Sequence, residues 1–152
     1  MTVLSLPSVH EEAWRWSDLS ALPALADAPA TGKAGDAGHL FLGCGGPRLL
    51  FIDGVFQAER SSPGPVTVGE TDVHAGGHPL AALAGRTGWT LALGRDHAPS
   101  APIEIVHVAT GGANHIAAQI DMDEDAQASV IETYVGDGWA NRLTAIRLGK
   151  GA

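Results

Sequence analysis

The residues of this chain best suited to metal or acid–base chemistry are its seven histidines. His74 and His78 are four residues apart, the spacing that puts two metal ligands on one face of a helix, and His97 follows as a third candidate. An Ala-Gly-Gly sequence separates the first two, however, and glycine disfavours the helix that this geometry needs. We therefore expect histidines on surface loops, and keep a metal-dependent β-rich enzyme using His74, His78 and His97 as the alternative function.

The remaining reactive residues do not form a recognisable catalytic motif. Cys44 is the only cysteine, so the chain forms no internal disulfide and cannot supply the four thiolates that an iron–sulfur cluster normally takes. The glycine-rich residues 43–46 lack the Lys-Ser/Thr of a phosphate-binding loop, and no Gly-x-Ser-x-Gly sequence is present. We expect a protein that is not an enzyme, with no catalytic, cofactor-binding or metal-ligating residue of its own.

Three further positions have both a structural and a functional interpretation. His107 lies between two valines, and we interpret it as a hydrogen-bonded or solvent-facing strand histidine. Glu132 is interpreted as an outward-pointing strand carboxylate. Trp14 and Trp16 flank Arg15; we expect them to anchor the N-terminal segment on its own domain, with a partner-binding patch as the alternative.

Composition restricts the classes of partner. The 152 residues carry a net charge of -8 with no cluster of Lys or Arg, which argues against nucleic acid and against anionic membrane surfaces. No apolar run approaches the roughly 20 residues that cross a bilayer. The N-terminus lacks the charged, apolar and small-residue succession of a signal peptide, so we expect a cytoplasmic protein.

Residues 1–100 are predicted to form a mixed region of short elements. We expect a helix over residues 11–22, ended by Pro23, and then an Ala/Pro-rich connector. In residues 48–56, two apolar runs flank Asp53-Gly54, which is the strongest hairpin signal in the chain. Residues 66–68 and 89–93 are further strand candidates, and residues 79–84 form a candidate helix.

Residues 101–152 carry a repeat. Strand-like runs alternate with four tetrapeptides that end in alanine and start at residues 110, 123, 137 and 149, in steps of 13, 14 and 12. A near-constant step with one strand and one tight turn favours a β-solenoid, although a meander of hairpins also yields short strands and turns. The repeat ends on a turn, where the next strand is expected, so we expect a truncated solenoid. A free-standing β-solenoid that self-associates through its open end is a further alternative.

Three blocks, in the same order, resemble the N-terminal part of the SufD family. Residues 6–19 combine a Leu-Pro, a charged pair and a Trp-basic-aromatic run that leads to a leucine. Residues 48–56 are similar to that family's Val/Phe-rich strand broken by Asp-Gly. Residues 102–113 and 126–134 resemble the beginning of its β-helix. Each block alone is a weak match, and the three together cover most of the chain except the connectors.

The resemblance implies a mainly β fold in which a mixed N-terminal region precedes the first coils of a right-handed parallel β-helix. It implies a non-catalytic scaffold subunit of the SUF iron–sulfur cluster assembly complex, acting with a SufB-like subunit and a SufC-like ATPase. The cluster would then be handled by the assembled complex rather than by this chain. Family members bind the ATPase through C-terminal helices and their partner subunit through later coils, so no functional residue is carried over to these 152 residues.

Overall fold

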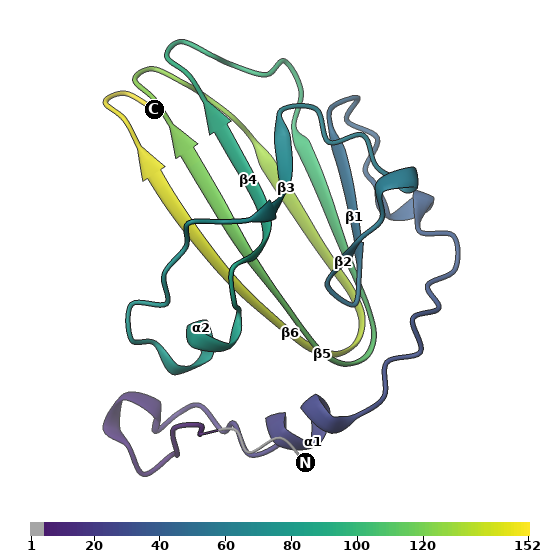
Figure 1. The fold of residues 1–152 in the computed structure, drawn as a ribbon, viewed down its shortest axis with the longest axis vertical. Helices are drawn as coiled ribbons and strands as arrows, with labels where there is room; N and C mark the ends of the chain where they lie inside the picture. The colour runs from purple at the N-terminus through teal and green to yellow at the C-terminus, as the bar shows by residue number, and fades with distance from the viewer. Residues whose placement is uncertain (1–4) are drawn as a thin grey trace.

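The fold is described from a computed structural model and covers residues 5–152. It is mainly β: strands β1 (Arg48–Ile52), β2 (Val55–Phe56), β3 (Val66–Glu70), β4 (Thr87–Leu93), β5 (Ile103–Met122) and β6 (Val130–Leu148) form one mixed sheet (Figure 1). Two short α-helices, α1 (Leu22–Asp27) and α2 (Pro79–Leu83), flank it together with three single-turn helices at Glu12–Trp14, Gly38–Leu40 and Ala58–Arg60. No helix within residues 5–152 is long and apolar enough to cross a membrane.

The long strand β5 organises the sheet. Its first part pairs in parallel with β1, its last part pairs in parallel with β4, and β6 pairs in parallel along nearly all of its other side. Strands β2 and β3 are added antiparallel to β1 and β4. The predicted boundary near residue 100 lies between β4 and β5, so strands from both predicted regions share this sheet.

Strands β5 and β6 both bend at glycines, so that each runs down one arm and up another (Figure 1). The register shifts between Thr110 and Ala113, at the bend of β5. On β6, Gly136 has φ +98°, and a Cβ there would lie 1.9 Å from the carbonyl oxygen of Ala109. The bend of β6 therefore requires glycine for its backbone angle and for the closeness of the neighbouring strand.

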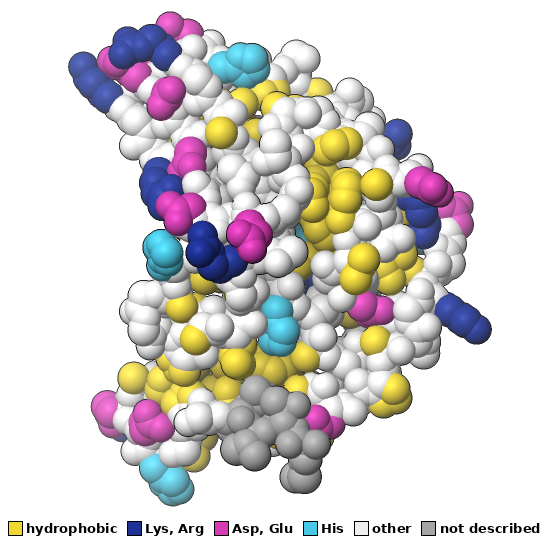
Figure 2. Space-filling view, in the orientation of Figure 1, with side chains coloured by type: hydrophobic (Ala, Val, Ile, Leu, Met, Phe, Trp, Pro, Cys, Tyr) yellow, Lys and Arg dark blue, Asp and Glu magenta, His cyan; other side chains and the backbone are white. Residues whose placement is uncertain are grey.

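The main hydrophobic core fills the space between the two arms. It contains the buried side chains of one face of the sheet, which we call the inner face: Leu49, Phe51, Val66, Trp89, Leu91, Leu93, Ile103, Ile105, Ile116, Ala118 and Ala126. A smaller cluster on the opposite face joins Leu50, Ile52 and Val106 to Ala37, which the N-terminal connector supplies. Charged side chains gather instead at the end of the sheet where the β4–β5 and β5–β6 loops meet, as in the ion pair between Arg95 and Glu124 (Figure 2).

Several predicted elements are confirmed. The Asp-Gly hairpin forms β1 and β2, with φ of 47° at Asp53 and 82° at Gly54. The predicted strands at residues 66–68 and 89–93 lie within β3 and β4, and the predicted helix at residues 79–84 is α2. Of the four predicted turns, those starting at residues 123 and 149 are turns, whereas those starting at 110 and 137 are the bends within β5 and β6.

The predicted N-terminal helix is wrong. Residues 11–22 contain only the single turn Glu12–Trp14, and Pro23, expected to end a helix, lies in the first turn of α1. Proline is tolerated there because the first amides of a helix have no intrahelical acceptor, and its fixed φ suits the helix. The residue thus begins a helix instead of ending one.

Candidate functional site

The most unusual group of side chains lies on the inner face near the bends of β5 and β6. Phe51, His107 and Tyr134 occupy matching positions on β1, β5 and β6, so their rings stack from strand to strand. The ring centroids are 5.2 Å apart between Phe51 and His107 and 4.8 Å apart between His107 and Tyr134. An imidazole is therefore sandwiched between two aromatic rings within a hydrophobic core.

Among residues 5–152, the side chain of His107 has no hydrogen-bond partner. The side chain is 2% exposed, and neither of its ring nitrogens is hydrogen-bonded to any described residue. Burial, helped by the nearby Arg142 charge, lowers its pKa from 6.5 to about 3, so the imidazole is neutral at pH 7. Its Nε2 lies 3.9 Å from Oε2 of Glu132, but a neutral ring at that distance makes neither an ion pair nor a hydrogen bond.

The prediction for His107 as a hydrogen-bonded or solvent-facing residue is consequently wrong. It was based on exposure statistics for histidine in general. The side chain instead occupies a core position of β5 because it continues the aromatic stack from Phe51.

Glu132 is also a correction. It pairs with Ile105, a fully buried core residue, and its side chain is 22% exposed, so it points inward and not outward. The Tyr134 hydroxyl donates a hydrogen bond to its carboxylate. Burial raises the pKa of Glu132, and the nearby Arg142 charge partly opposes this rise.

Arg142 completes the group from the second arm of β6, at the position that pairs with Ile116 of the core. Its guanidinium donates to the side-chain oxygen of Asn114 at 2.6 Å and to the backbone carbonyls of Asn114 and Asn141 at 3.1 and 3.0 Å. It lies 5.5 Å from the Tyr134 ring centroid. Burial lowers its pKa to about 10, which leaves it positively charged at pH 7.

We call His107, Glu132, Tyr134 and Arg142 the inner polar cluster. Three of its members, His107, Tyr134 and Arg142, line a cavity of about 160 Å³ together with Gly136 and Gly138 at the bend. Within residues 5–152, Glu132 and Arg142 form no ion pair within 4.0 Å of each other, although each charge shifts the other's pKa. The cluster thus places the carboxyl group of Glu132 and the guanidinium of Arg142 on opposite arms of β6. Both side chains are partly buried, and they form no ion pair with each other.

Sequence reasoning noted two members of this cluster, His107 and Glu132, and missed the other two. The signal that could have found them is the alternation of side chains along β6. Glu132, Tyr134 and Arg142 are all at even-numbered positions, as are the exposed Ile146 and Leu148. Because side chains alternate between the two faces of a strand, these residues share a face on either arm. That inference needs the bend between them to preserve the alternation, which is visible only in three dimensions.

The three histidines of the alternative enzyme are not brought together. Nε2 of His74 lies 3.4 Å from Oδ1 of Asp72. His78 instead caps α2, where its Nδ1 accepts from the Ala81 amide. His97 is in the loop after β4, where its backbone carbonyl accepts from Gln127. Among the residues that the structure describes, no three His, Cys, Asp or Glu side chains are grouped so that they could hold a metal ion.

The structure also places Cys44 and the two N-terminal tryptophans, which the sequence singles out. The exposed Cys44 lies in a loop held by Glu104, whose buried carboxylate accepts from the amides of Leu42 and Cys44. Trp14 packs on His78 with ring centroids 5.4 Å apart, whereas Trp16 is 87% exposed. The two tryptophans thus differ: one contacts the domain and the other faces solvent beside Arg15.

Comparisons with protein-family models, with curated proteins and with solved structures found no match to this chain.

Proposed function

We propose that this chain is the N-terminal part of a SufD-like scaffold subunit, which acts with a SufB-like subunit and a SufC-like ATPase in iron–sulfur cluster assembly. The proposal starts from the three sequence blocks in their order along the chain. The second block forms the β1–β2 hairpin, and the third covers the first arm of β5 and most of the first arm of β6. The chain itself would contribute architecture and binding surfaces, not catalysis.

One observation carries the proposal: the parallel ladder between β5 and β6. Ile103 pairs with Val130 and Met122 with Leu148, so the chain advances by nearly the same number of residues at both ends of the ladder. Strands β1 and β4 lie parallel to the two arms of β5 on its other side. Successive parallel layers with bends at matching places are what the first coils of a parallel β-helix require, so this arrangement supports that finer description of the fold.

The polar cluster does not argue for an enzyme of a defined class. His107 is enclosed between two rings, and the Arg142 guanidinium is engaged by Asn114 and Asn141. A nucleophile with its own base and an oxyanion-binding pair, the arrangement that acyl-transfer chemistry needs, is not assembled around these residues. A scaffold role accommodates the cluster as part of a surface between layers.

The test is co-purification. The complete gene product would be expressed with a tag beside the SufB-like and SufC-like proteins of the same source, and residues 1–152 would be tagged in parallel. We expect the complete product to retain both partners through salt washing. Recovery of neither partner would refute the assignment to this pathway, and a tagged unrelated β-protein serves as the control for non-specific retention.

A further inference from the structure

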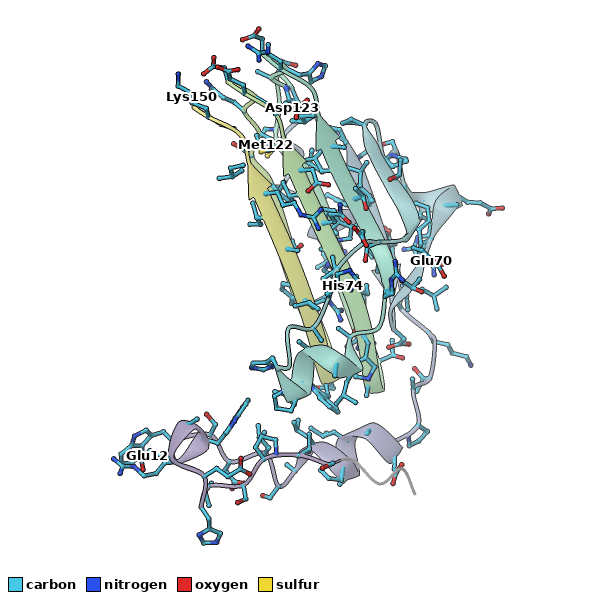
Figure 3. All side chains as sticks on the ribbon, turned by 60° about the vertical axis from the view of Figure 1, so that its left-hand side comes forward. Glu12, Glu70, His74, Met122, Asp123 and Lys150 are labelled. Carbon is cyan, nitrogen blue, oxygen red and sulfur yellow. The ribbon has the colours of Figure 1, made fainter. Side chains whose placement is uncertain are left out.

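Residues 71–86, which we call the outer segment, link β3 to β4 and contain α2. The segment lies on the face of the sheet opposite the main core and passes from Glu70, by way of His74, to α2 (Figure 3). Its Val73, Ala81 and Ala84 are buried. The outer segment is therefore packed against the sheet, and its polar contacts decide how firmly α2 is held.

Asn141 of β6 anchors α2 to the sheet. Its buried side-chain Nδ2 lies 2.8 Å from the carbonyl oxygen of Leu80 and 3.1 Å from Nδ1 of His115. A carbonyl oxygen can only accept, so Asn141 faces Leu80 with its NH₂ group and not with its own oxygen. Because an NH₂ group only donates, Nδ1 of His115 accepts and the imidazole proton is on Nε2. The anchor therefore requires a neutral His115.

His78 meets the same requirement at the start of α2. Its Nδ1 accepts from the Ala81 amide at 3.3 Å and so caps the first turn of the helix. A doubly protonated imidazole has no lone pair with which to accept. Trp14 packs on the same ring, with centroids 5.4 Å apart. Two histidines thus hold α2 in place, each through an unprotonated Nδ1.

We propose that the outer segment is a pH-sensitive switch, in which protonation of His115 and His78 releases α2 from the sheet. Protonated His115 presents an N–H to the NH₂ group of Asn141, and two donors repel each other. If the Asn141 amide turns over to accept from His115, its oxygen faces the Leu80 carbonyl, so the anchor is lost in either orientation. Protonated His78 loses the bond from the Ala81 amide at the same time.

The contacts at the two ends of the segment do not depend on protonation. The amide and the hydroxyl of Thr71 both donate to the carbonyl of Arg86, at 2.7 and 3.0 Å. The Asp72 amide donates to the side-chain oxygen of Gln119 at 2.8 Å. Acid therefore leaves the ends of the segment on the sheet, and α2 alone moves away and uncovers Asn141.

Glycines on both sides of α2 supply the hinges for this movement. Gly76 and Gly77 precede the helix with φ of 57° and 83°, and Gly85 follows it with φ of 68°. Glycine adopts these left-handed angles without the steric cost that other residues meet, and it has the widest choice of alternatives when the contacts of the helix are lost.

The sign of the pH dependence follows from His115. Burial, helped by the charge of Arg142 on β6, lowers its pKa below 6.5 in the closed form. The released form then binds a proton more readily than the closed form, so the closed form loses stability as the pH falls below 6.5. The charged groups on the neighbouring elements have partners elsewhere: Asp72 with His74, Arg86 and Arg147, and Glu11 with the Ser8 amide.

The test is hydrogen exchange, expressed as protection factors so that the intrinsic pH dependence of exchange cancels. Between about pH 7.5 and about pH 5.5 the protection of residues 79–84 should fall at least about tenfold, the effect of losing one helix cap and one hydrogen bond. The amides of β4 should keep their protection. Nitrogen NMR of the two imidazoles should show Nδ1 unprotonated at neutral pH, and the fall in protection should follow their titration.

Asparagine at positions 115 and 78 keeps an acceptor near the place of Nδ1 and does not titrate. The double variant His115→Asn/His78→Asn should therefore keep its protection at both pH values, whereas Asn141→Leu should lose it at both. His74→Asn is the matched control, because it removes an exposed histidine of the same segment that does not contact α2, and it should show the wild-type fall.

Constant protection in the wild type would overturn the proposal, as would a fall that does not follow the imidazole titration. A proton on Nδ1 of His115 at neutral pH would overturn it as well, and this measurement needs no variant. So would loss of the fall in His74→Asn, with the sheet intact by circular dichroism. The inference concerns the conformation of this chain alone, and it does not depend on the proposed role in iron–sulfur cluster assembly.

Discussion

Replacing His107 by phenylalanine should stabilise the protein, and more so in acid. The imidazole is enclosed between Phe51 and Tyr134, and its two buried nitrogens have no hydrogen-bond partner in the described part of the chain. An unsatisfied buried polar group costs about 1–3 kcal/mol, and a phenyl ring keeps the stack while removing both nitrogens. Since the larger ring needs some adjustment of its neighbours, we expect a gain of about 1 kcal/mol near pH 7.5.

The pH dependence follows from the pKa of His107, which is about 3 in the fold and 6.5 in the unfolded chain. Between these values the unfolded state binds a proton that the native state does not, so the wild type loses stability as the pH falls below 6.5. At about pH 5 the difference of 1.5 units corresponds to about 2 kcal/mol. The Phe variant lacks this loss, so its advantage should grow to about 3 kcal/mol at that pH.

The assay is urea unfolding followed by tryptophan fluorescence at about pH 7.5 and about pH 5. Glu132 has a raised pKa, so its own contribution to stability falls as the pH rises above 4.5; it is present in both proteins and largely cancels in the comparison. His97→Phe, at an exposed loop position, is the control for the chemical change itself. An advantage that stays constant between the two pH values would refute the buried, neutral state of His107. If the variant is less stable than the wild type by more than about 1 kcal/mol at pH 7.5, the ring nitrogens of His107 have partners in the wild type.

Three further substitutions test the parts of the fold that hold the site. Glu104→Ala should lower the free energy of unfolding by about 1–3 kcal/mol and speed labelling of Cys44 by a thiol reagent, because the carboxylate holds that loop through two backbone amides; unchanged labelling would contradict this. Gly136→Ala should lower the free energy of unfolding by at least about 2 kcal/mol, measured by thermal unfolding. The φ of +98° disfavours a side chain, and the added methyl group would lie 1.9 Å from the carbonyl oxygen of Ala109. Asp53→Ala should cost about 1–2 kcal/mol in urea unfolding because Asp53 accepts from both the amide and the hydroxyl of Thr110, at 2.7 and 2.6 Å; an Asn variant, which tolerates the positive φ, should lose less.

Local signals predicted the local elements of this fold. Asp53-Gly54 predicted the hairpin because an Asp-Gly pair adopts the left-handed angles that a tight turn needs. The apolar runs predicted β3 and β4 for a similar reason, since their patterns do not depend on what lies next to them. The prediction of a helix over residues 11–22 was wrong because proline is found in the first turn of a helix as well as after its end. The residues around Pro23 do not distinguish these two positions.

The candidate site was less predictable than the fold. Glu132 and Arg142 are ten positions apart in one strand, and nothing in that spacing shows that a bend turns both toward the same interior. His107 was assigned to the surface or to a hydrogen bond because that is where most strand histidines lie. Its burial depends on the stack with Phe51 and Tyr134, two rings contributed by strands before and after it.

The sequence by itself determined that the protein is mainly β, where its turns and bends fall, and which stretches are apolar enough to be buried. These properties follow from backbone preferences and from the period of side chains along one strand, which are local in the chain. Only the tertiary structure decided that β5 lies between earlier and later strands in parallel register. The same register places the carboxyl group of Glu132, the guanidinium of Arg142, the phenol of Tyr134 and the imidazole of His107 on one face of the sheet. Those juxtapositions depend on pairing between residues far apart in sequence, where register and bend set the contacts and no local preference encodes them.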